Sequence, residues 1–285
     1  MSRTDPDRQP HDREIDVFGL SDVGLRRQKN EDHFLVCSLR RRLAVHTTSL
    51  TDLRGLPRQG DRLAALAVVA DGAGGMEAGE TASRTAVEAL MRYVTSSMNC
   101  YYTSDPASEE AFLEEIRGAA LQCHESVLTE ADRTGQTMAT TLTLALFHWP
   151  LIYVVQVGDS RFYRLRDGKL EQITTDQTLY QELIEDGHEE VAPQFSNVLT
   201  SALGGPTAIP VVTRLEQRRD DVLMMCSDGL AGVVPDETIE RRLVEMESAE
   251  QACRALVQDA LDAGGPDNVT VVVGRVRPRR ERPET

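Results

Sequence analysis

Short apolar runs recur along most of the chain, and glycine, proline or aspartate bounds nearly every one of them. Many of these runs are rich in β-branched residues, a composition typical of β-strands. Asp167-Gly168 stands between two such runs and is typical of a tight hairpin turn. The pattern predicts strands at about residues 15–20, 33–39, 63–70, 139–147, 151–157, 161–165, 169–173, 210–215, 221–226 and 268–276.

Apolar residues at helical spacing occur in two pairs of segments that interrupt the series of strands. The helices are expected at residues 78–95, 108–131, 237–246 and 249–262. Asp236 is the expected cap of the third helix, and Ser248 with Gln251 makes a capping-box pattern before the fourth. Strands gathered between two helical pairs predict a layered α+β domain rather than a βαβ repeat.

The organisation of the chain indicates one domain with charged, proline-containing ends. Residues 1–13 and 277–285 are predicted to be mobile tails, and the second of them is basic. Residues 14–276 form the predicted domain, with no internal repeat and no interdomain linker. Within it we expect a long hairpin or excursion at residues 39–61 and a helix plus an irregular flap at residues 176–205.

Composition and charge narrow the range of possible functions. The 285 residues are 40% hydrophobic and 27% charged, as in ordinary soluble globular proteins, and the net charge is −15. A strongly acidic chain argues against a broad nucleic-acid-binding face. The first fourteen residues lack an apolar signal core, and the run at residues 63–70 is too short to span a bilayer. We therefore expect a cytoplasmic protein without a membrane or nucleic-acid partner.

The cysteines exclude two further classes of protein. There are five of them, widely spaced and without a Cys-x-x-Cys pair, which indicates reduced thiols rather than a disulfide framework or a structural zinc site. None begins a Cys-x5-Arg phosphate loop, because the sixth residue after Cys37 is Leu43 and the sixth after Cys226 is Gly232. A phosphatase with a cysteine nucleophile is therefore not expected.

Aspartates stand at the ends of the most apolar runs. Asp71 follows residues 63–70, Asp228 follows the run that ends at Cys226, and Asp267 comes directly before the last strand. A carboxylate at a strand end is held rigidly, and Gly72 leaves its own carbonyl open to a hard cation. Carboxylates, carbonyls and water suit Mg²⁺ or Mn²⁺. Each signal alone is also typical of a turn, so the metal site depends on their combination.

Taken in order, these segments resemble the metal-dependent serine/threonine protein phosphatases of the PP2C type (PPM family), especially bacterial stand-alone members. The resemblance spans about residues 15–276. It rests on Ser-Asp-Val-Gly-x-x-Arg-x-x-Asn-Glu-Asp (21–32), Val-Ala-Asp-Gly-x-Gly-Gly-x-x-x-Gly-Glu-x-Ala-Ser (69–83), Met-x-Thr-Thr (138–141), Val-Gly-Asp-Ser-Arg (157–161), Asn-Val-Leu-Thr-x-Ala-Leu-Gly (197–204), Cys-Ser-Asp-Gly-Leu (226–230) and Gly-Gly-x-Asp-Asn-Val-Thr (264–270).

The resemblance implies a four-layer α-β-β-α sandwich, with two antiparallel sheets flanked by helical pairs and a binuclear metal centre at one edge. It implies that Asp71 bridges two Mn²⁺ or Mg²⁺ ions, that Asp228 and Asp267 complete the shell of one ion, and that the Gly72 carbonyl binds the other. The supporting acids that it implies beside the ions are Glu31, Asp32 and Asp159.

The same resemblance implies a mechanism. Arg27 matches the arginine that holds the substrate phosphate, for which a guanidinium fork is well suited. Water bridging two divalent ions has a lowered pKa and attacks phosphorus in line, so no covalent phosphoenzyme is required. Asn268 either orients Asp267 or a metal-bound water, or caps a turn.

Four departures from the family pattern concern proton supply, a third ion and substrate handling. Ala73 replaces the histidine or methionine common two residues after the bridging aspartate, so the leaving group must be protonated by water or another residue. Thr137 replaces an aspartate that holds a third metal in some bacterial members, so support for a third ion would have to come from Asp159 and Asp228, with Asp132 nearby in sequence. The flap has Asp176-Gln177 where Asp-His is common, and Ser201 where arginine is frequent.

The predicted function is hydrolysis of phosphoserine and phosphothreonine in phosphorylated proteins, opposing a bacterial Ser/Thr kinase. A pseudophosphatase that uses the same fold as a binding module is the alternative from another class. Asp71, Asp228, Asp267 and Arg27 are all present and argue against it. A phosphatase of anti-sigma-antagonist proteins is a third hypothesis, and the lone catalytic domain leaves it open.

Overall fold

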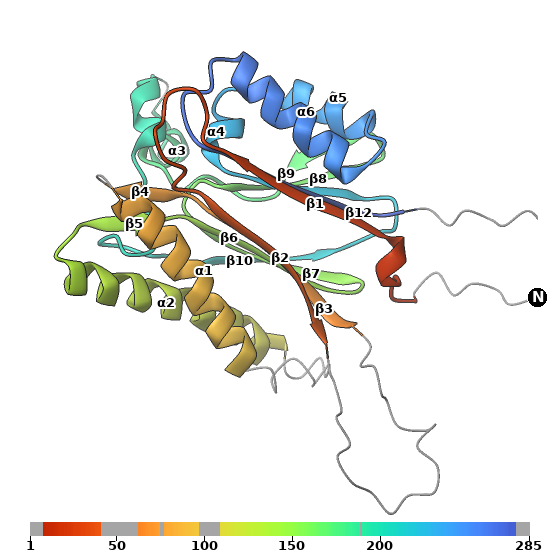
Figure 1. Cartoon of the computed structure of the whole chain (residues 1–285), viewed down its shortest axis with the longest axis horizontal. Helices are drawn as coiled ribbons and strands as arrows, with labels where there is room; N and C mark the ends of the chain where they lie inside the picture. The colour runs from red at the N-terminus through yellow and green to blue at the C-terminus, as the bar shows by residue number, and fades with distance from the viewer. Residues whose placement is uncertain (1–7, 41–61, 75–76, 97–108, 189, 278–285) are drawn as a thin grey trace, which may run out of the picture.

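The computed structural model describes residues 8–40, 62–74, 77–96, 109–188 and 190–277 of the chain. Two five-stranded antiparallel sheets lie face to face (Figure 1). The first sheet has the strand order β1 (Ile15–Asp22), β12 (Val269–Val276), β11 (Val222–Cys226), β8 (Arg161–Arg166) and β9 (Lys169–Gln172). The second has the order β10 (Val211–Glu216), β7 (Leu151–Val157), β6 (Leu142–His148), β3 (Arg62–Ala70) and β2 (His33–Arg40).

Helices cover both outer faces of this pair of sheets (Figure 1). The first pair, α1 (Ala78–Ser96) and α2 (Glu109–Thr134), packs on the second sheet. The other pair, α5 (Asp236–Val244) and α6 (Ala249–Asp262), packs on the first sheet, together with the short α4 (Asp228–Ala231). The predicted four-layer α-β-β-α sandwich is therefore confirmed. No helix within the described residues is long and apolar enough to cross a membrane.

Three apolar layers hold the sandwich together. One lies between α1, α2 and the second sheet, and another lies between α5, α6 and the first sheet. The third fills the space between the sheets, where Ala67, Val69, Phe162 and Met225 are almost completely buried. Burial of a large apolar side chain contributes about 1.5–3 kcal/mol, so each layer stabilises the fold through many such side chains.

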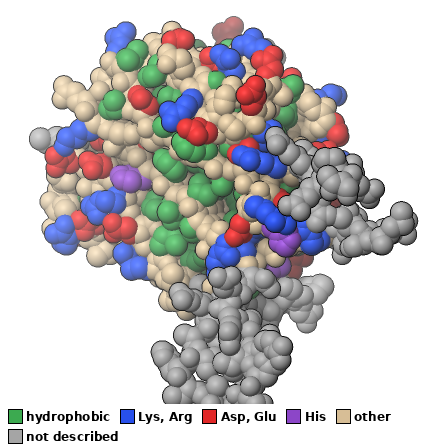
Figure 2. Space-filling model, turned by 45° about the vertical axis from the view of Figure 1, so that its right-hand side comes forward, with side chains coloured by type: hydrophobic (Ala, Val, Ile, Leu, Met, Phe, Trp, Pro, Cys, Tyr) green, Lys and Arg blue, Asp and Glu red, His purple; other side chains and the backbone are tan. Residues whose placement is uncertain are grey.

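The inter-sheet layer opens at one end. A cavity of about 120 Å³ lies there, lined mainly by apolar residues that include Val36, Phe147, Leu223 and Val272. Figure 2 shows the molecule from the side on which β1 and β2 diverge, and hydrophobic side chains gather in the middle of that face between charged ones. Val17 of β1 is 42% exposed.

The opposite end of the sandwich gathers loops from distant parts of the chain. Asp22 pairs with Val269, and Cys226 pairs with Val271, so β1 and β11 end where β12 begins. Ala70 at the end of β3 pairs with His33 at the start of β2. Antiparallel pairing therefore brings the loops after β1, β3 and β11 to one edge, together with the loop before β12.

Two predicted elements differ from the structure. The strand expected at residues 139–147 is split into β5 (Met138–Thr140) and β6, which belong to different sheets. The partner of β5 is β4 (Gly72–Gly74), a strand too rich in glycine to be predicted from apolar periodicity. Asp236 was predicted as a helix cap, but Pro235 occupies that position and Asp236 is the first helical residue.

The remaining sequence predictions concern the ends, the excursion and the flap. Residues 1–7, 278–285 and most of the predicted excursion at 39–61 lie outside the described residues. Residues 8–13 contact the body, since the Gln9 amide donates to the Arg62 carbonyl at 2.9 Å and the helical turn η1 (Asp12–Glu14) leads into β1. The flap contains α3 (Leu179–Glu185) and the short turn η4 (Pro193–Asn197).

Candidate metal centre

Asp71 lies directly after β3, and its backbone is fixed by two threonines. Its amide donates to the Thr141 hydroxyl at 3.0 Å, and its carbonyl accepts from the Thr141 amide and the Thr140 hydroxyl, both at 2.8 Å. These bonds hold the peptide between β3 and β4 from both sides. The carboxylate therefore projects from a rigid frame rather than from a loose loop.

Asp228 is the first residue of α4 and follows β11 after one intervening residue, Ser227. Ser227 joins three segments of the chain. The Ser227 hydroxyl donates to the Asp32 carboxylate at 2.7 Å and accepts from the Thr270 amide at 3.0 Å. Asp32, which is only 5% exposed, is thereby connected to the strand end that carries Asp228.

Asn268 fastens the loop after β1 to the start of β12. Its side-chain oxygen accepts from the Glu31 amide at 2.7 Å, and its amide nitrogen donates to the carbonyls of Val23 and Lys29, both at 2.9 Å. The backbone N–H of Asn268 also donates to the Asp267 carboxylate at 2.8 Å. Its side chain therefore positions the 23–31 loop, whereas its backbone orients Asp267.

Gly72 and Gly79 allow the start of α1 to approach the centre closely. A Cβ on Gly72 would lie 2.1 Å from the Gly79 carbonyl oxygen and 2.7 Å from that of Glu31. A Cβ on Gly79 would lie 2.8 Å from the Glu31 carboxyl carbon. No side chain larger than hydrogen fits at either position without displacing backbone, so Gly72 and Glu31 remain adjacent.

The acids of the cluster interact strongly with one another. Burial, followed by repulsion from neighbouring carboxylates, raises the pKa of Asp32 to about 7 and that of Asp159 to about 8. The same causes raise the pKa of Asp71 and of Asp228. The cluster therefore gathers more negative charge than its buried surroundings readily accept.

Arg27 and Asp267 form an ion pair of 2.7 Å at the exposed side of this cluster. Half of the Arg27 side chain is exposed. The hydrogen bond to Asp267 raises the pKa of Arg27 despite partial burial, and the charges of Glu31 and Asp71 add to this effect. The predicted phosphate-binding arginine therefore lies beside the predicted metal ligands, within their field.

The donor set fits a hard divalent cation. No group of three or more His, Cys, Asp or Glu side chains in the described part of the chain is already arranged to hold a metal ion, and Asp267 accepts a hydrogen bond from Arg27 instead. However, one carboxylate oxygen of Asp32 and one of Asp228 are buried without a hydrogen-bond partner. A divalent cation among these oxygens would offset the repulsion and satisfy both orphaned atoms.

Every predicted acid thus reaches one region, but the residues that hold the acids were not identified from the sequence. Thr141 and Ser227 fix Asp71 and Asp32, and the Ser160 hydroxyl in turn bonds Thr141 at 2.7 Å. A signal was present, because Ser160 and Ser227 stand directly beside Asp159 and Asp228, and Thr141 belongs to the Met-x-Thr-Thr segment. Periodicity alone could not show which acid each hydroxyl contacts.

Comparison with known proteins identifies the family. Residues 54–264 match the model of the protein phosphatase 2C family. The Mycobacterium tuberculosis serine/threonine protein phosphatase PstP is 39% identical over 220 residues, which are 75% of this chain and 40% of PstP. The serine/threonine phosphatase stp of Listeria welshimeri is 32% identical over 213 residues, which are 73% of this chain and 83% of stp.

Solved structures agree with this assignment. Crystalline PstP from M. tuberculosis aligns with a TM-score of 0.72 at 31% identity, over 93% of this chain and 99% of that one. The catalytic domain of PstP in complex with two manganese ions aligns with a TM-score of 0.71 at 32% identity, over 93% of this chain and 99% of that one. This fold and its cluster of acids define the class of PPM-type phosphatases. The chain belongs to the protein phosphatase 2C family, and it spans about 40% of the length of the mycobacterial relative.

Proposed function

We propose that this protein is a metal-dependent protein serine/threonine phosphatase that hydrolyses phosphoserine and phosphothreonine with metal-activated water. The observation that carries the proposal is the acid cluster, in which Asp32 and Asp228 each bury an unsatisfied carboxylate oxygen close to other buried acids. Such a cluster is unfavourable unless cations occupy it. The relative PstP, whose catalytic domain was crystallised with two manganese ions, supports the same assignment.

The residues would divide the work as follows. Asp71 would bridge two Mn²⁺ or Mg²⁺ ions, Asp228 and Asp267 would complete one shell, and the Gly72 carbonyl would bind the other ion. Glu31, Asp32 and Asp159 would support the ions directly or through water, and Asp159 and Asp228 are the residues that could support a third. When bound, the ions supply a water of lowered pKa that is oriented for attack on phosphorus.

The other chemical steps involve residues of the chain. The Arg27 guanidinium would bind the phosphate oxygens. Because this guanidinium also donates a hydrogen bond to Asp267, the phosphate and the Asp267 carboxylate would compete for it. As the water oxygen bonds to phosphorus, the bond from phosphorus to the serine or threonine oxygen breaks. Ala73 has no proton to give to that oxygen, so the proton would come from solvent.

The proposed partners follow from the reaction, and the proposed location follows from the state of the cysteines. A phosphoserine/phosphothreonine phosphatase needs phosphorylated proteins, and we propose a bacterial Ser/Thr kinase as the enzyme that it opposes. Cys123, Cys226 and Cys253 are buried free thiols, and burial raises the pKa of each to about 12. Inert thiols of this kind fit the reducing cytoplasm, which is where we place the protein.

The test is hydrolysis of p-nitrophenyl phosphate and of a phosphothreonine peptide, with Mn²⁺ present or removed by EDTA. We expect turnover only with the metal, and its loss in Asp71→Asn and Asp228→Asn. Asp132→Asn is the matched control, because Asp132 is an exposed aspartate of α2 outside the cluster. Turnover that persists in EDTA, or none with Mn²⁺, would contradict the proposal.

A further inference from the structure

The two elements inside the flap (residues 176–205) have little apolar anchorage of their own, although Leu203 near the end of the flap is fully buried in the core. Neither α3 nor η4 contains a buried residue, and these two elements pack mainly on each other. Ile184 and Val198 are 42% and 44% exposed. The positions of α3 and η4 relative to the sandwich therefore depend on the two ends of the flap, where the buried Leu203 anchors one end and polar contacts hold the other.

The two ends of the flap pair with each other and form a closed neck. The Leu179 amide donates to the Val198 carbonyl at 2.8 Å, and the Thr200 amide donates to the Gln177 carbonyl at 2.9 Å. Between these two bonds, Thr178 and Leu199 are paired in an isolated antiparallel β-bridge. Movement of the neck would consequently move α3 and η4 together as one unit.

Gln177 fastens this neck to the loop that carries Asp159. Its amide donates to the Gly158 carbonyl at 3.1 Å, while its side-chain oxygen accepts from the Gly158 amide at 2.7 Å. The Gln177 side-chain nitrogen donates to the Ile209 carbonyl at 2.8 Å. The Asp-Gln departure from the family pattern thus has a structural role, since one glutamine side chain bonds both sides of the neck.

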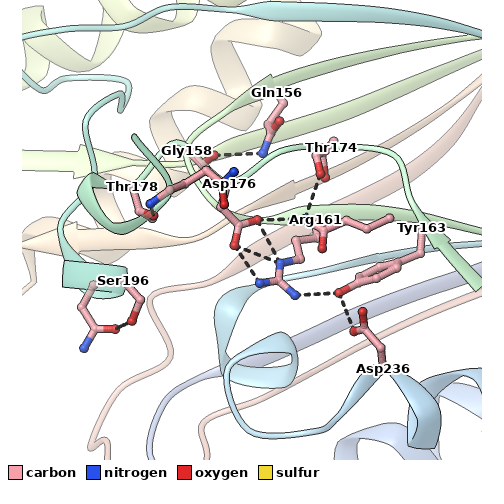
Figure 3. Close-up of polar contacts among 12 residues, drawn as sticks. Gln156, Gly158, Arg161, Tyr163, Thr174, Asp176, Thr178, Ser196 and Asp236 are labelled. Carbon is pink, nitrogen blue, oxygen red and sulfur yellow. Dashed lines mark hydrogen bonds and ion pairs between the residues drawn. The ribbon is translucent and has the colours of Figure 1, made fainter. Parts of the chain in front are cut away.

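The charged anchor of the neck is the pair Arg161–Asp176 (Figure 3). The guanidinium donates to both carboxylate oxygens of Asp176, through Nε at 2.9 and 3.1 Å and through Nη2 at 2.7 Å. Its Nη1 donates to the Tyr163 hydroxyl at 2.8 Å, which donates to Asp236 at 3.1 Å. Only 23% of the Arg161 side chain and 20% of that of Asp176 are exposed, so the pair is weakly screened.

Arg161 belongs to the same rigid frame as the acid cluster. It begins β8 two residues after Asp159, and the intervening Ser160 bonds the Thr141 hydroxyl that also holds Asp71. The Ser160 carbonyl further accepts from the Thr143 hydroxyl at 2.7 Å. Figure 1 shows α3 at the edge of the sandwich where β3 leads into β4. The anchor therefore connects the flap to the frame that positions the cluster.

We propose that Arg161 is a positioning residue that, by its two-point pairing with Asp176, fixes the flap relative to the acid cluster and thereby governs binding of phosphoprotein substrates. The clause on substrates rests on the proposed phosphatase function. A small phosphate ester reaches only the acid cluster and Arg27. A phosphorylated peptide extends past them toward the flap, so only the peptide senses where the flap lies.

The first experiment does not depend on catalysis. Arg161→Lys keeps the charge but loses the planar fork, and Asp176→Asn keeps the shape but loses the charge. We expect amide hydrogen exchange across residues 179–197 to become about tenfold faster in either variant, with exchange in the sheets unchanged. Arg166→Lys is the control, because Arg166 of the same strand makes a similar two-point pair with Asp221, both bonds at 2.7 Å.

The second experiment separates substrate binding from chemistry. In Arg161→Lys with Mn²⁺ we expect kcat/KM for a phosphothreonine peptide to fall about tenfold, mainly through KM. The rate on p-nitrophenyl phosphate should stay within about twofold of wild type. Arg161→Lys/Asp176→Asn should lose no more than the single variants, since all three break one pair.

Two results would overturn the inference. Equal losses on both substrates without faster exchange in the flap would mean that Arg161 acts on the metal centre. Unchanged exchange and unchanged kinetics would mean that the pair does not position the flap. A wild-type protein that hydrolyses neither substrate with Mn²⁺ contradicts the phosphatase function instead, and the exchange comparison still decides whether Arg161 holds the flap.

Discussion

The Ser227 hydroxyl donates a hydrogen bond of 2.7 Å to the carboxylate of Asp32, 195 residues away in the sequence. The other oxygen of Asp32 is buried and has no partner. One residue of the loop after β1 is thus oriented by the residue that precedes Asp228. The contact leaves one carboxylate oxygen for an additional partner, which the acid cluster does not itself supply.

Neutralising one acid should stabilise the metal-free protein. Asp228→Asn removes one charge from the buried acids and so reduces the repulsion among them. We expect Tm in EDTA to rise by about 2 °C, as measured by thermal unfolding. Mn²⁺ at a hundredfold excess over Kd should stabilise wild type by about 2.7 kcal/mol and the variant far less. A lower Tm of Asp228→Asn in EDTA would contradict this account, and Asp132→Asn is its control.

The pH dependence of stability should run opposite to that of most acidic proteins. The folded pKa is about 7 for Asp32 and about 8 for Asp159, whereas an unfolded aspartate titrates near pH 4. Between about pH 4 and 8 the folded state therefore binds more protons than the unfolded state, so the stability from these groups falls as pH rises.

Urea unfolding in EDTA at several pH values measures this effect. The free energy of unfolding should be lower at pH 8 than at pH 5.5, and Asp159→Asn should flatten the slope because it removes one raised pKa. Mn²⁺ should reverse the trend, since metal ligands must be deprotonated. A metal-free protein that gains stability from pH 5.5 to 8 would show that the acids are not buried together.

Much of the fold was predictable because its strands are short, apolar and bounded by turn residues. The hairpin at Asp167-Gly168 illustrates this, since both residues adopt the positive φ that the dipeptide favours. By contrast, β4 has the sequence Gly-Ala-Gly and exists only because Met138–Thr140 pairs with it. A strand that depends on a partner 66 residues away leaves no local pattern.

The site was predictable to the same degree. Acids at strand ends could be located, and the structure brings Asp71, Asp228 and Asp267 to one edge; their role as metal ligands stays a prediction. The contacts of Asn268 with the 23–31 loop could not be found, because they depend on the register of β1 against β12. The ion pair of Arg27 with Asp267 likewise joins residues that are 240 positions apart.

A buried ion pair at the end of β8 should contribute strongly to stability. Asp221 is fully buried, accepts two bonds from Arg166 and a third from the Arg218 amide, all at 2.7 Å. Asp221→Ala leaves the guanidinium without its partner, so we expect a loss of about 3 kcal/mol in urea unfolding. Activity per folded molecule should not change, because Asp221 lies outside the acid cluster. A loss below the error of the measurement would show that Arg166 finds another partner.

Two glycine-to-alanine substitutions should have opposite effects. Gly118 lies inside α2, where a Cβ would meet only the Tyr93 hydroxyl oxygen, at 3.7 Å. Gly118→Ala should therefore stabilise the protein by about 0.5–1 kcal/mol through helix propensity.

At Gly72 a Cβ would lie 2.1 Å from the Gly79 carbonyl oxygen, so the β4 backbone and the start of α1 must separate. Because this displaces the predicted carbonyl ligand, Gly72→Ala should weaken Mn²⁺ binding about 10–100-fold. Isothermal titration with Mn²⁺ measures this change, with Gly118→Ala as the control for the added methyl group. Equal Mn²⁺ affinity in the two variants would mean that the Gly72 carbonyl takes no part in the centre.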